Sequence, residues 1–343
     1  MSSEVLPLIE EGADELYCGY LPAEWEKKYT NLEFERKGGS SNFTNINELR
    51  LAIKLAHRKN VPVFVALNGL YISEQYRMLL DIINSLNRIG IDGYIVADLG
   101  LLLTLKGLGF NKEIHISTGG AVFNQEAVDF YNRLGAKRII LDRQTSLETI
   151  DALSSYYPRM EFEVFILNTL CVYIDGLCTF MHSPLDMAKD RHSMAGRSTN
   201  VYTTYDINAY KEACSLKYSV KSCDISGRGL QQAKKIAPVF HKPLTDGVEC
   251  NACSLYYLNK MNIKAAKIVG RQLSAQARLK SIRFIRAVLD ILDSNKGISK
   301  RDFMLKTKRL YRNSFNYHKL CEGNNCYHPE VLRYGKGHFN QQS

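Results

Sequence analysis

Short apolar runs rich in β-branched residues recur along the first 271 residues, and amphipathic stretches separate them. Strands are predicted at seven of these runs: Glu15–Tyr20, Pro62–Asn68, Gly93–Asp98, Glu113–Thr118, Arg138–Arg143, Glu161–Asn168 and Lys267–Arg271. Helices are predicted at Asn47–Arg58, Ser73–Ile89, Asn124–Leu134 and Leu147–Tyr156. Strands between residues 62 and 161 begin roughly every 20 to 30 residues, a period typical of repeated βα units. The chain is therefore expected to form a parallel sheet, either open or closed into a barrel.

Polar residues close most of the predicted strands, and this pattern favours the barrel. They are Asn68, Asp98, Thr118, Arg143, Asn168 and Arg271. In a (β/α)8 barrel the carboxyl ends of the strands meet at one rim, where such folds keep their active sites. Loops are polar in any case, so one such residue carries little weight. Six in series favour an α/β fold with a TIM-like (β/α)8 barrel.

The βα rhythm breaks after Asn168. Residues 171–253 hold six of the nine cysteines and only short apolar runs, which indicates a cysteine-rich insertion between late strands. Two basic amphipathic stretches follow the last predicted strand, at Ala275–Leu292 and Lys300–Arg312. We therefore expect a barrel over residues 1–272 and a basic α-helical C-terminal extension over residues 273–343.

Positive charge is concentrated in the C-terminal part of the chain. From Ser254 onward there are 18 basic and 5 acidic residues, a net charge of +13, whereas residues 1–253 carry −3. Aromatic residues are interleaved with the cations, as on surfaces that bind RNA phosphates and stack on bases. An acidic protein, including another subunit, fits the same field, and solvated helix faces explain such charge equally well.

The cysteines are the first candidates for function. No apolar run approaches the ~20 residues of a membrane helix, and the N-terminus has no signal sequence, so a cytoplasmic protein without membrane insertion is expected. In a reducing compartment, clustered cysteines more often serve metals or redox chemistry than disulfides. The widely spaced set comprises Cys171, Cys178, Cys214, Cys250 and Cys253. Four thiolates on separate loops can hold a [4Fe–4S] cluster, and unrelated buried thiols are the equal alternative.

Several segments between residues 12 and 271 carry motifs in a fixed order. They are GADELYCG (Gly12–Gly19), GGSSNFT (Gly38–Thr44), VALNGL, IVADLG, HISTGG, NRLGAKRIILDRQTSLETI, EVFILNTLCVYIDGLC and KIVGR. Together they resemble the collagenase-like peptidase family U32. The resemblance implies a TIM-like barrel and, as in characterised relatives, an iron–sulfur cluster held by four cysteines. Those relatives hydroxylate ubiquinone precursors or RNA bases without dioxygen, and some use prephenate as the oxygen donor.

The resemblance also implies the cluster ligands. They are Cys171, Cys178, Cys214 and Cys250, with Cys253 as the reserve candidate. A second metal site is conceivable near the C-terminus, although a flexible tail explains that composition more commonly. Its residues would be His318, Cys321, Cys326 and His328.

The sequence departs from the family at several rim positions. Leu167 and Asn168 replace the histidine and glycine before the first ligand, Gln144 replaces a glutamate, and Gly119 replaces a glutamine. Only Cys214 is left to represent the family's NRGxCxxxCR stretch. We therefore expect the metal site to persist with a different substrate, which would be an RNA base, a small metabolite or a peptide.

Four rim residues are candidates for the chemistry. Arg143 and Arg271 each close a strand and can hold an anionic group such as that of prephenate, although a structural arginine paired with an acid is an equal alternative. Asn68 and Asp98 are expected to form hydrogen bonds with the substrate. His115 lies inside a predicted strand and is expected to be a hydrogen-bonded barrel-core histidine.

The expected function is oxygen-independent hydroxylation that depends on a [4Fe–4S] cluster. One alternative is a U32 collagenase-like peptidase, although no Ser–His–Asp order, HExxH motif or paired catalytic carboxylates can be recognised. The other alternative is a non-catalytic iron–sulfur subunit that partners a second, active U32-like subunit. The missing histidine and glutamate favour that alternative.

Overall fold

The computed structural model describes residues 2–29, 42–168, 174–177, 248–271, 273–316 and 326–333 of the chain. The chain divides into two compact units, Met1–Cys178 with Asp246–Ser343 and, separately, Thr179–Thr245. All described residues belong to the first unit. The cysteine-rich insertion predicted at 171–253 lies mostly outside the described residues, and a domain boundary at residue 272 stays a prediction.

Eight parallel strands form one sheet in the order β2-β1-β3-β4-β5-β6-β7-β8. Their bounds are β1 (Leu16–Tyr20), β2 (Asn42–Phe43), β3 (Val63–Leu67), β4 (Gly93–Val96), β5 (Glu113–Ile116), β6 (Arg138–Ile140), β7 (Glu161–Leu167) and β8 (Ala265–Ile268). From β3 onward each strand pairs with the next one in the sequence, as expected for successive βα units. The predicted parallel α/β sheet is confirmed. Only the very short β2 was missing from the prediction.

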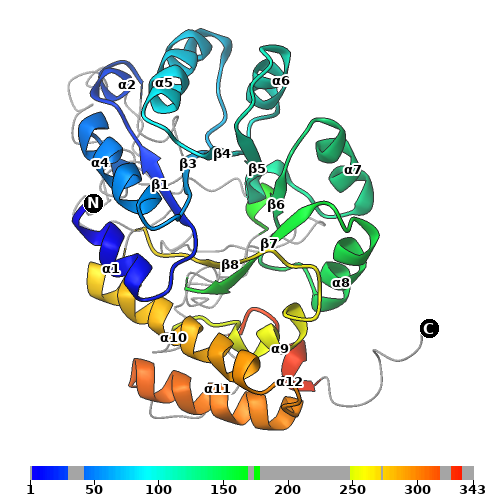
Figure 1. Ribbon diagram of the computed structural model, residues 1–343. Coiled ribbons are helices and arrows are strands. Elements are labelled where there is room, and N and C mark those ends of the chain that lie inside the picture. Colours follow the sequence, from blue (N-terminus) through cyan, green and yellow to red (C-terminus); the bar gives the residue numbers. More distant parts are fainter. Residues whose placement is uncertain are drawn as a thin grey trace, which may run out of the picture. The chain divides into compact units, whose positions relative to one another are not determined.

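The sheet curls into a half-barrel (Figure 1). The strand order places β2 and β8 at its two edges. The edges are joined by a side-chain contact, because Arg271 Nη1 lies 3.3 Å from Asn42 Oδ1. β2 has two residues that pair with β1, which leaves little backbone for a ladder with β8. The expected eight-stranded TIM-like architecture is therefore present as an open half-barrel rather than as a closed barrel.

Helices follow most strands and cover the outer face of the sheet (Figure 1). Their bounds are α1 (Val5–Glu10), α2 (Ala23–Lys28), α4 (Ile46–His57), α5 (Tyr76–Arg88), α6 (Leu99–Gly107), α7 (Gln125–Arg133), α8 (Leu147–Tyr156), α9 (Leu255–Leu258), α10 (Ala275–Ser294), α11 (Lys300–Phe315) and α12 (Glu330–Arg333). The sequence pattern does not predict α6, because its run LGLLLTLKG is apolar on nearly every side and lacks an amphipathic period. No helix in the described ranges is both long and apolar enough to cross a membrane.

Six of the helices, α4, α6, α7, α8, α10 and α11, begin where a polar side chain caps the first turn. The capping residues, whose side chains accept a backbone amide hydrogen bond, are Asn45, Asp98, Asn124, Ser146, Ser274 and Ser299. Such caps satisfy amide groups that the helix itself leaves without acceptors, typically worth ~1 kcal/mol each. They fix the residue at which each of these six helices begins.

Alternate residues of the strands pack into two separate apolar layers. The layer inside the half-barrel consists of Phe64, Ala66, Ile95, Ile140, Phe165 and Tyr327. The intervening residues of β3, which are Val63, Val65 and Leu67, pack under the helices in the larger core. This alternation is the period of two that a strand buried on both faces requires. The inner layer forms the floor beneath the carboxyl ends of the strands.

Three arginine–carboxylate pairs join α10 to the N-terminal region. The pairs are Arg278–Glu4, Arg283–Glu11 and Arg286–Asp14. Figure 1 shows α10 beside α1 and α11 beyond α10. Between α10 and α11, the Phe284 ring lies 5.9 Å from that of Tyr311 and 5.2 Å from that of Phe315. The positive charge of α10 is therefore largely neutralised within the chain.

Candidate active site

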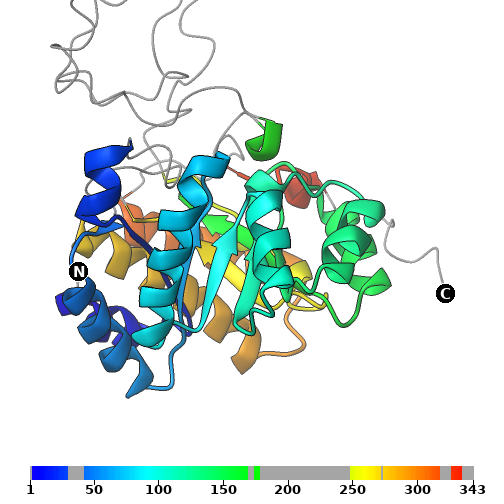
Figure 2. The ribbon, with the colours of Figure 1, turned by 90° about the horizontal axis from the view of Figure 1, so that it is seen from above.

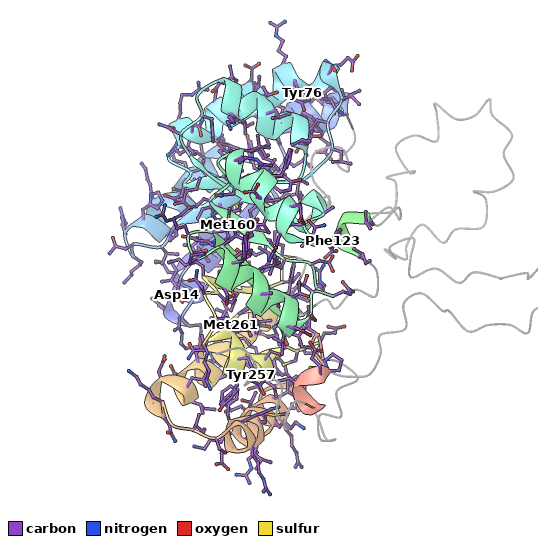
Figure 3. The ribbon with its side chains drawn as sticks, turned by 90° about the vertical axis from the view of Figure 1, so that its right-hand side faces the viewer. Asp14, Tyr76, Phe123, Met160, Tyr257 and Met261 are labelled. Carbon is purple, nitrogen blue, oxygen red and sulfur yellow. The ribbon has the colours of Figure 1, made fainter. Side chains whose placement is uncertain are left out.

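The two ends of the half-barrel lie on opposite sides in Figure 3. Asp14, which precedes β1, lies at the amino end, whereas Tyr76 and Phe123 lie toward the carboxyl end. Figure 2 places the short helix η5 (Asp175–Leu177) and α12 on the same, carboxyl side. Parallel α/β sheets bind ligands at the carboxyl ends of their strands. This rim is therefore where the predicted site residues are expected to meet.

Arg143 lies at the rim, just beyond β6, and only 9% of its surface is exposed. Its Cζ lies 4.1 Å from the centroid of the Phe165 ring, and its guanidinium pairs with the Asp175 carboxylate. Asp142 holds the same loops together, because Oδ2 accepts the Asp175 amide at 2.8 Å and Oδ1 accepts the Gln144 amide at 2.9 Å. Burial raises the pKa of Asp142, although these amide hydrogen bonds oppose the shift. Arg143 at the rim is therefore stacked on an aromatic ring and paired with a carboxylate.

Residues 326–333 return from the C-terminal helices to the mouth of the half-barrel. Tyr327 belongs to the inner apolar layer, and its hydroxyl donates a hydrogen bond to the Asn168 carbonyl. Burial raises the pKa of Tyr327, although the nearby Arg143 acts against that rise. The sequence analysis missed this contribution, because no local pattern shows that a segment so far downstream packs at the mouth.

Asp98 serves first as a helix cap. Its Oδ1 accepts the Leu101 amide at 2.6 Å and the Tyr76 hydroxyl at 2.8 Å, and its Oδ2 accepts the Tyr71 amide at 3.2 Å. Burial, followed by this hydrogen bond from the Tyr76 hydroxyl, raises the pKa of Tyr76. These three hydrogen-bond donors explain why an aspartate stands at the end of this strand. Asn68 is half-buried just after β3, and contact of either residue with a substrate stays a prediction.

A cavity of about 980 Å³ lies between the two sheet edges and α10. Its lining includes Arg271 and Asn42 at the seam, with Tyr17, Lys267 and Arg138 further inside. Lys267 Nζ lies 4.1 Å and Arg271 Cζ 5.7 Å from the centroid of the Tyr17 ring. Both cations border one aromatic ring, but Lys267 is also paired with Glu163, so Arg271 at the seam is the cation of this wall that suits an anionic ligand.

A charged cluster fills the half-barrel below the inner apolar layer, toward the amino end. Arg138 is 2% exposed and contacts Glu15 at 2.5 and 2.8 Å, Glu161 at 2.9 and 3.0 Å, and Glu163 at 3.1 Å. Lys267 Nζ lies 2.5 Å from Glu163 Oε1. Burial disfavours the charge on Arg138, but the surrounding carboxylates raise its pKa overall. Burial likewise opposes ionisation of Glu163, yet Lys267 and Arg138 lower its pKa overall.

His115 lies next to this charged cluster and is 1% exposed. Its ring centroid is 4.3 Å from that of Phe64, and its Nε2 is 3.3 Å from Glu113 Oε2. Burial, followed by the charge of Arg138, lowers the pKa of His115 to about 3. It is therefore a neutral core histidine, as expected. The sequence analysis missed the cluster itself, although the alternating Glu161 and Glu163 in β7 were a signal for it.

The predicted cluster ligands are only partly within the described residues. Cys171, Cys178 and Cys214 lie outside them. Cys250 is half-buried, forms an antiparallel bridge with Leu167 at the end of β7, and its Sγ accepts the Ala252 amide at 3.3 Å. Cys253 follows in the short helix η8 (Ala252–Ser254), is 8% exposed and packs in the apolar core. Cys250 thus lies at the rim and Cys253 in the core.

Comparison with known proteins identifies the family. The sequence matches the model of peptidase family U32 over residues 2–330. The chain belongs to peptidase family U32. This confirms the resemblance seen in the sequence motifs.

Curated relatives of this U32 chain carry different names. The uncharacterized protease MJ0090 of Methanocaldococcus jannaschii is 28% identical over 63% of this chain and 51% of its own length. The tRNA hydroxylation protein P of Escherichia coli is 28% identical over 49% of this chain and 34% of its own length. The 23S rRNA 5-hydroxycytidine C2501 synthase of Escherichia coli is 25% identical over 80% of this chain and 37% of its own length. The chain thus spans about half, or less, of the length of these relatives.

The structure explains one departure of this U32 chain from its family. Asn168, in place of a glycine, has a φ of 67°, a left-handed conformation that asparagine tolerates better than most residues. Its side-chain amide donates to the Val269 carbonyl at 2.7 Å and lies 3.2 Å from the Ser281 hydroxyl. Leu167, in place of a histidine, is buried in the core, and Gln144, in place of a glutamate, is exposed. Asn168 therefore adopts a bend that a glycine would also allow, and it ties β7 to the end of β8 and to α10.

A thiolate-bound cluster fits what this U32 chain offers at the rim. The Cys250 sulfur is half-buried and already accepts one amide hydrogen bond, which stabilises the thiolate that a soft metal requires. Cys326 lies beside Cys250 through a parallel bridge. Within the described ranges no three potential ligands gather into a complete metal site. A cluster at this rim therefore needs further ligands from elsewhere in the chain.

Proposed function

We propose that this U32 chain hydroxylates an RNA base without dioxygen, with the aid of a [4Fe–4S] cluster held at the carboxyl rim. The observation that carries the proposal is the Cys250 thiol, which stands at the end of β7 with an amide directed at its sulfur. The relatives named for tRNA hydroxylation and for 5-hydroxycytidine synthesis in 23S rRNA support RNA as the substrate class.

Cys250 would hold the cluster together with the other ligands that the family resemblance implies. Those are Cys171, Cys178 and Cys214, with Cys253 in reserve. A bound cluster would supply a Lewis-acidic iron and a route for single electrons. The burial of Cys253 in the apolar core favours Cys250 over Cys253 as the ligand from this segment.

The chain's own residues would bind and orient the reactants. Arg271 at the seam cavity would bind a carboxylate of the oxygen donor, for which we propose prephenate. Arg143, already paired with Asp175 and stacked on Phe165, acts as a positioning residue for the loop after β6. Asn68 would donate a hydrogen bond to the base. The apolar layer below the rim keeps water away from the reacting atoms.

The helix α11 is the part of the basic C-terminal region that best suits RNA. Five cations of α11 lie on its solvent-facing side, where they are half-buried or exposed, and Asp302 is the acidic residue among them. The five cations are Arg301, Lys306, Lys308, Arg309 and Arg312. Among the described residues none of these five forms an ion pair, whereas the arginines of α10 are paired with acids near the N-terminus. We propose that this α11 face contacts RNA phosphates. An acidic protein or a second U32-like subunit is the alternative occupant.

The proposed function predicts that the anaerobically purified full-length chain contains about four irons per polypeptide and adds one oxygen atom to an RNA nucleoside. Iron and labile sulfide are measured chemically, and nucleosides from digested RNA are analysed by mass spectrometry. The added oxygen should depend on prephenate and should disappear in Cys250→Ala and in Arg271→Met.

Three outcomes would contradict the proposal in different ways. A colourless chain without iron would remove the cluster. Peptide hydrolysis that persists in Cys250→Ala, without any change in RNA, would favour the peptidase. Oxygen transfer that occurs only when a co-encoded U32 relative is present, and that survives Arg271→Met, would favour the role of a non-catalytic subunit.

A further inference from the structure

The segment that begins at Cys326 brings a second thiol to the rim. Cys250 and Cys326 form a parallel β-bridge, in which the Tyr327 amide donates to the Cys250 carbonyl at 3.3 Å. Bridged residues of neighbouring strands project their side chains to the same side. The Cys250 and Cys326 side chains therefore project to the same side near the end of β7, although sequence analysis assigned Cys326 to a separate C-terminal group.

Several contacts fix Cys326 in this place. Tyr327 is buried in the inner layer, and its hydroxyl donates to the Asn168 carbonyl. His328 is 2% exposed, with Nε2 3.0 Å from the Thr145 carbonyl. Glu330 Oε1 accepts the amide of the first residue of α8 at 3.3 Å, and the next residue along the segment is fully buried. The backbone around Cys326 is thus anchored on both the floor and the outer wall of the rim.

The surroundings of the two rim thiols differ from those of Cys253. Cys250 and Cys326 also pack against the apolar core that contains Cys253, but both are only half-buried and keep part of their surface exposed. The Ala252 amide donates to Cys250 Sγ at 3.3 Å, an interaction that favours a thiolate. Cys253 is 8% exposed and packs among apolar side chains, an environment that disfavours a thiolate.

We propose that Cys326, rather than Cys253, is the thiolate that binds the same metal centre as Cys250. The inference rests on the proposed function, because it assigns a ligand to the cluster that the function requires. Cys250 and Cys326 would form half of a soft, four-thiolate ligand set, and two of Cys171, Cys178 and Cys214 would complete it, so Cys326 takes the place of one ligand that the family resemblance implies. The segment that begins at Cys326 is thereby part of the metal site.

The test uses the full-length chain and three matched variants, Cys250→Ala, Cys326→Ala and Cys253→Ala, all purified without oxygen. Iron and sulfide per chain, the electron paramagnetic resonance spectrum of the reduced protein and the rate of iron loss to a chelator are measured. Cys326→Ala and Cys250→Ala are expected to lose iron at least ~10-fold faster than the unaltered chain. Cys253→Ala is expected to keep the iron content and the spectrum. Circular dichroism establishes that each variant is folded.

A second measurement keeps the two proposals apart. If the unaltered chain binds no iron, the cofactor of the proposed function is wrong, and Cd²⁺ titration followed by thiolate absorption then tests the pair directly. Cys250→Ala and Cys326→Ala should each weaken Cd²⁺ binding at least ~10-fold, and Cys253→Ala should not. The inference is overturned if Cys326→Ala matches the unaltered chain in both experiments. A Cys250–Cys326 disulfide in the anaerobic protein would also overturn it, because it would assign the pair to redox chemistry.

Discussion

The amino end of the half-barrel and its carboxyl rim contain the same kinds of charged side chain but use them differently. At the amino end, the Arg138 guanidinium is surrounded by Glu15, Glu161 and Glu163 below an apolar floor. At the rim, Arg143 pairs with Asp175 of a one-turn helix and borders an aromatic ring, a tyrosine and the end of β7. The densest charge cluster is thus the part of the barrel that contributes to stability. The smaller group of charges around Arg143 lies at the rim, where a ligand can bind.

Replacing Arg138 and Arg143 one at a time should cause the largest changes in the free energy of unfolding, and it tests the comparison of the two ends directly. Arg138→Met leaves three carboxylates without their shared partner, so the free energy of unfolding should fall by about 3–5 kcal/mol. Arg143→Met leaves one carboxylate, on a short helix that can adjust, and should lower the same free energy by about 1–3 kcal/mol. Urea unfolding followed by circular dichroism measures both values.

A surface variant and an activity assay complete that experiment. Arg133→Met removes an exposed pair with Asp129 and should change the free energy of unfolding by less than about 1 kcal/mol. Arg143→Met should abolish RNA hydroxylation in a chain that remains folded. Equal destabilisation by Arg138→Met and Arg143→Met would show that both ends of the barrel depend on charge pairing alike, and the comparison would then be wrong.

The sequence predicted most of the sheet because its information is local. Most βα units show an apolar run, a polar strand end and a capped helix, and these features need no knowledge of distant residues. A polar residue at a strand end can cap the next helix as well as bind a ligand, and the sequence does not separate the two roles. Asp98 is an example, because its carboxylate caps α6. The pairing of Arg143 with Asp175 and of Cys250 with Cys326 joins separate loops, and no local period encodes such contacts.

Acid should weaken the amino end through His115, and burial also lowers the pKa of His328 at the rim. Burial, followed by the charge of Arg138, lowers the pKa of His115 to about 3 from its ordinary value of 6.5. As the pH falls below 6.5, the unfolded chain gains a proton that the folded chain does not. This group therefore lowers the free energy of unfolding by about 1.4 kcal/mol per pH unit. Glu163, whose pKa is lowered from 4.5, adds a further loss only in more acidic solution.

Two variants separate titration from packing at this position. His115→Gln and His115→Phe both remove the titrating ring nitrogens but differ in size and polarity. Both should lose the slope of about 1.4 kcal/mol per pH unit between about pH 6 and about pH 5, whatever their stability at neutral pH. Urea unfolding at several pH values gives the slope. A slope unchanged from that of the unaltered chain in both variants would assign the acid sensitivity to another group.

The smallest effect on stability, and a clear effect on binding, is expected on α11. Reversing Arg301, Lys308 and Arg312 to glutamate removes cations that form no ion pair among the described residues. The free energy of unfolding should change by no more than ~0.5 kcal/mol. Affinity for single-stranded RNA should fall, and its dependence on salt concentration should weaken by about 0.7 in logarithmic slope for each phosphate that the helix no longer binds.

The matched control carries the same change of charge on a different helix. Lys54, Arg58 and Lys59 are exposed on and just after α4, and their reversal to glutamate should leave the salt dependence of RNA binding unaltered. Equal weakening by both triple variants would mean that RNA responds only to net charge. Unchanged RNA binding in the α11 variant, together with loss of a co-purifying acidic subunit, would assign the face to a protein partner. In either case the cations of α11 would not form an RNA site. The chain would then have to bind RNA through contacts of the rim with the base alone.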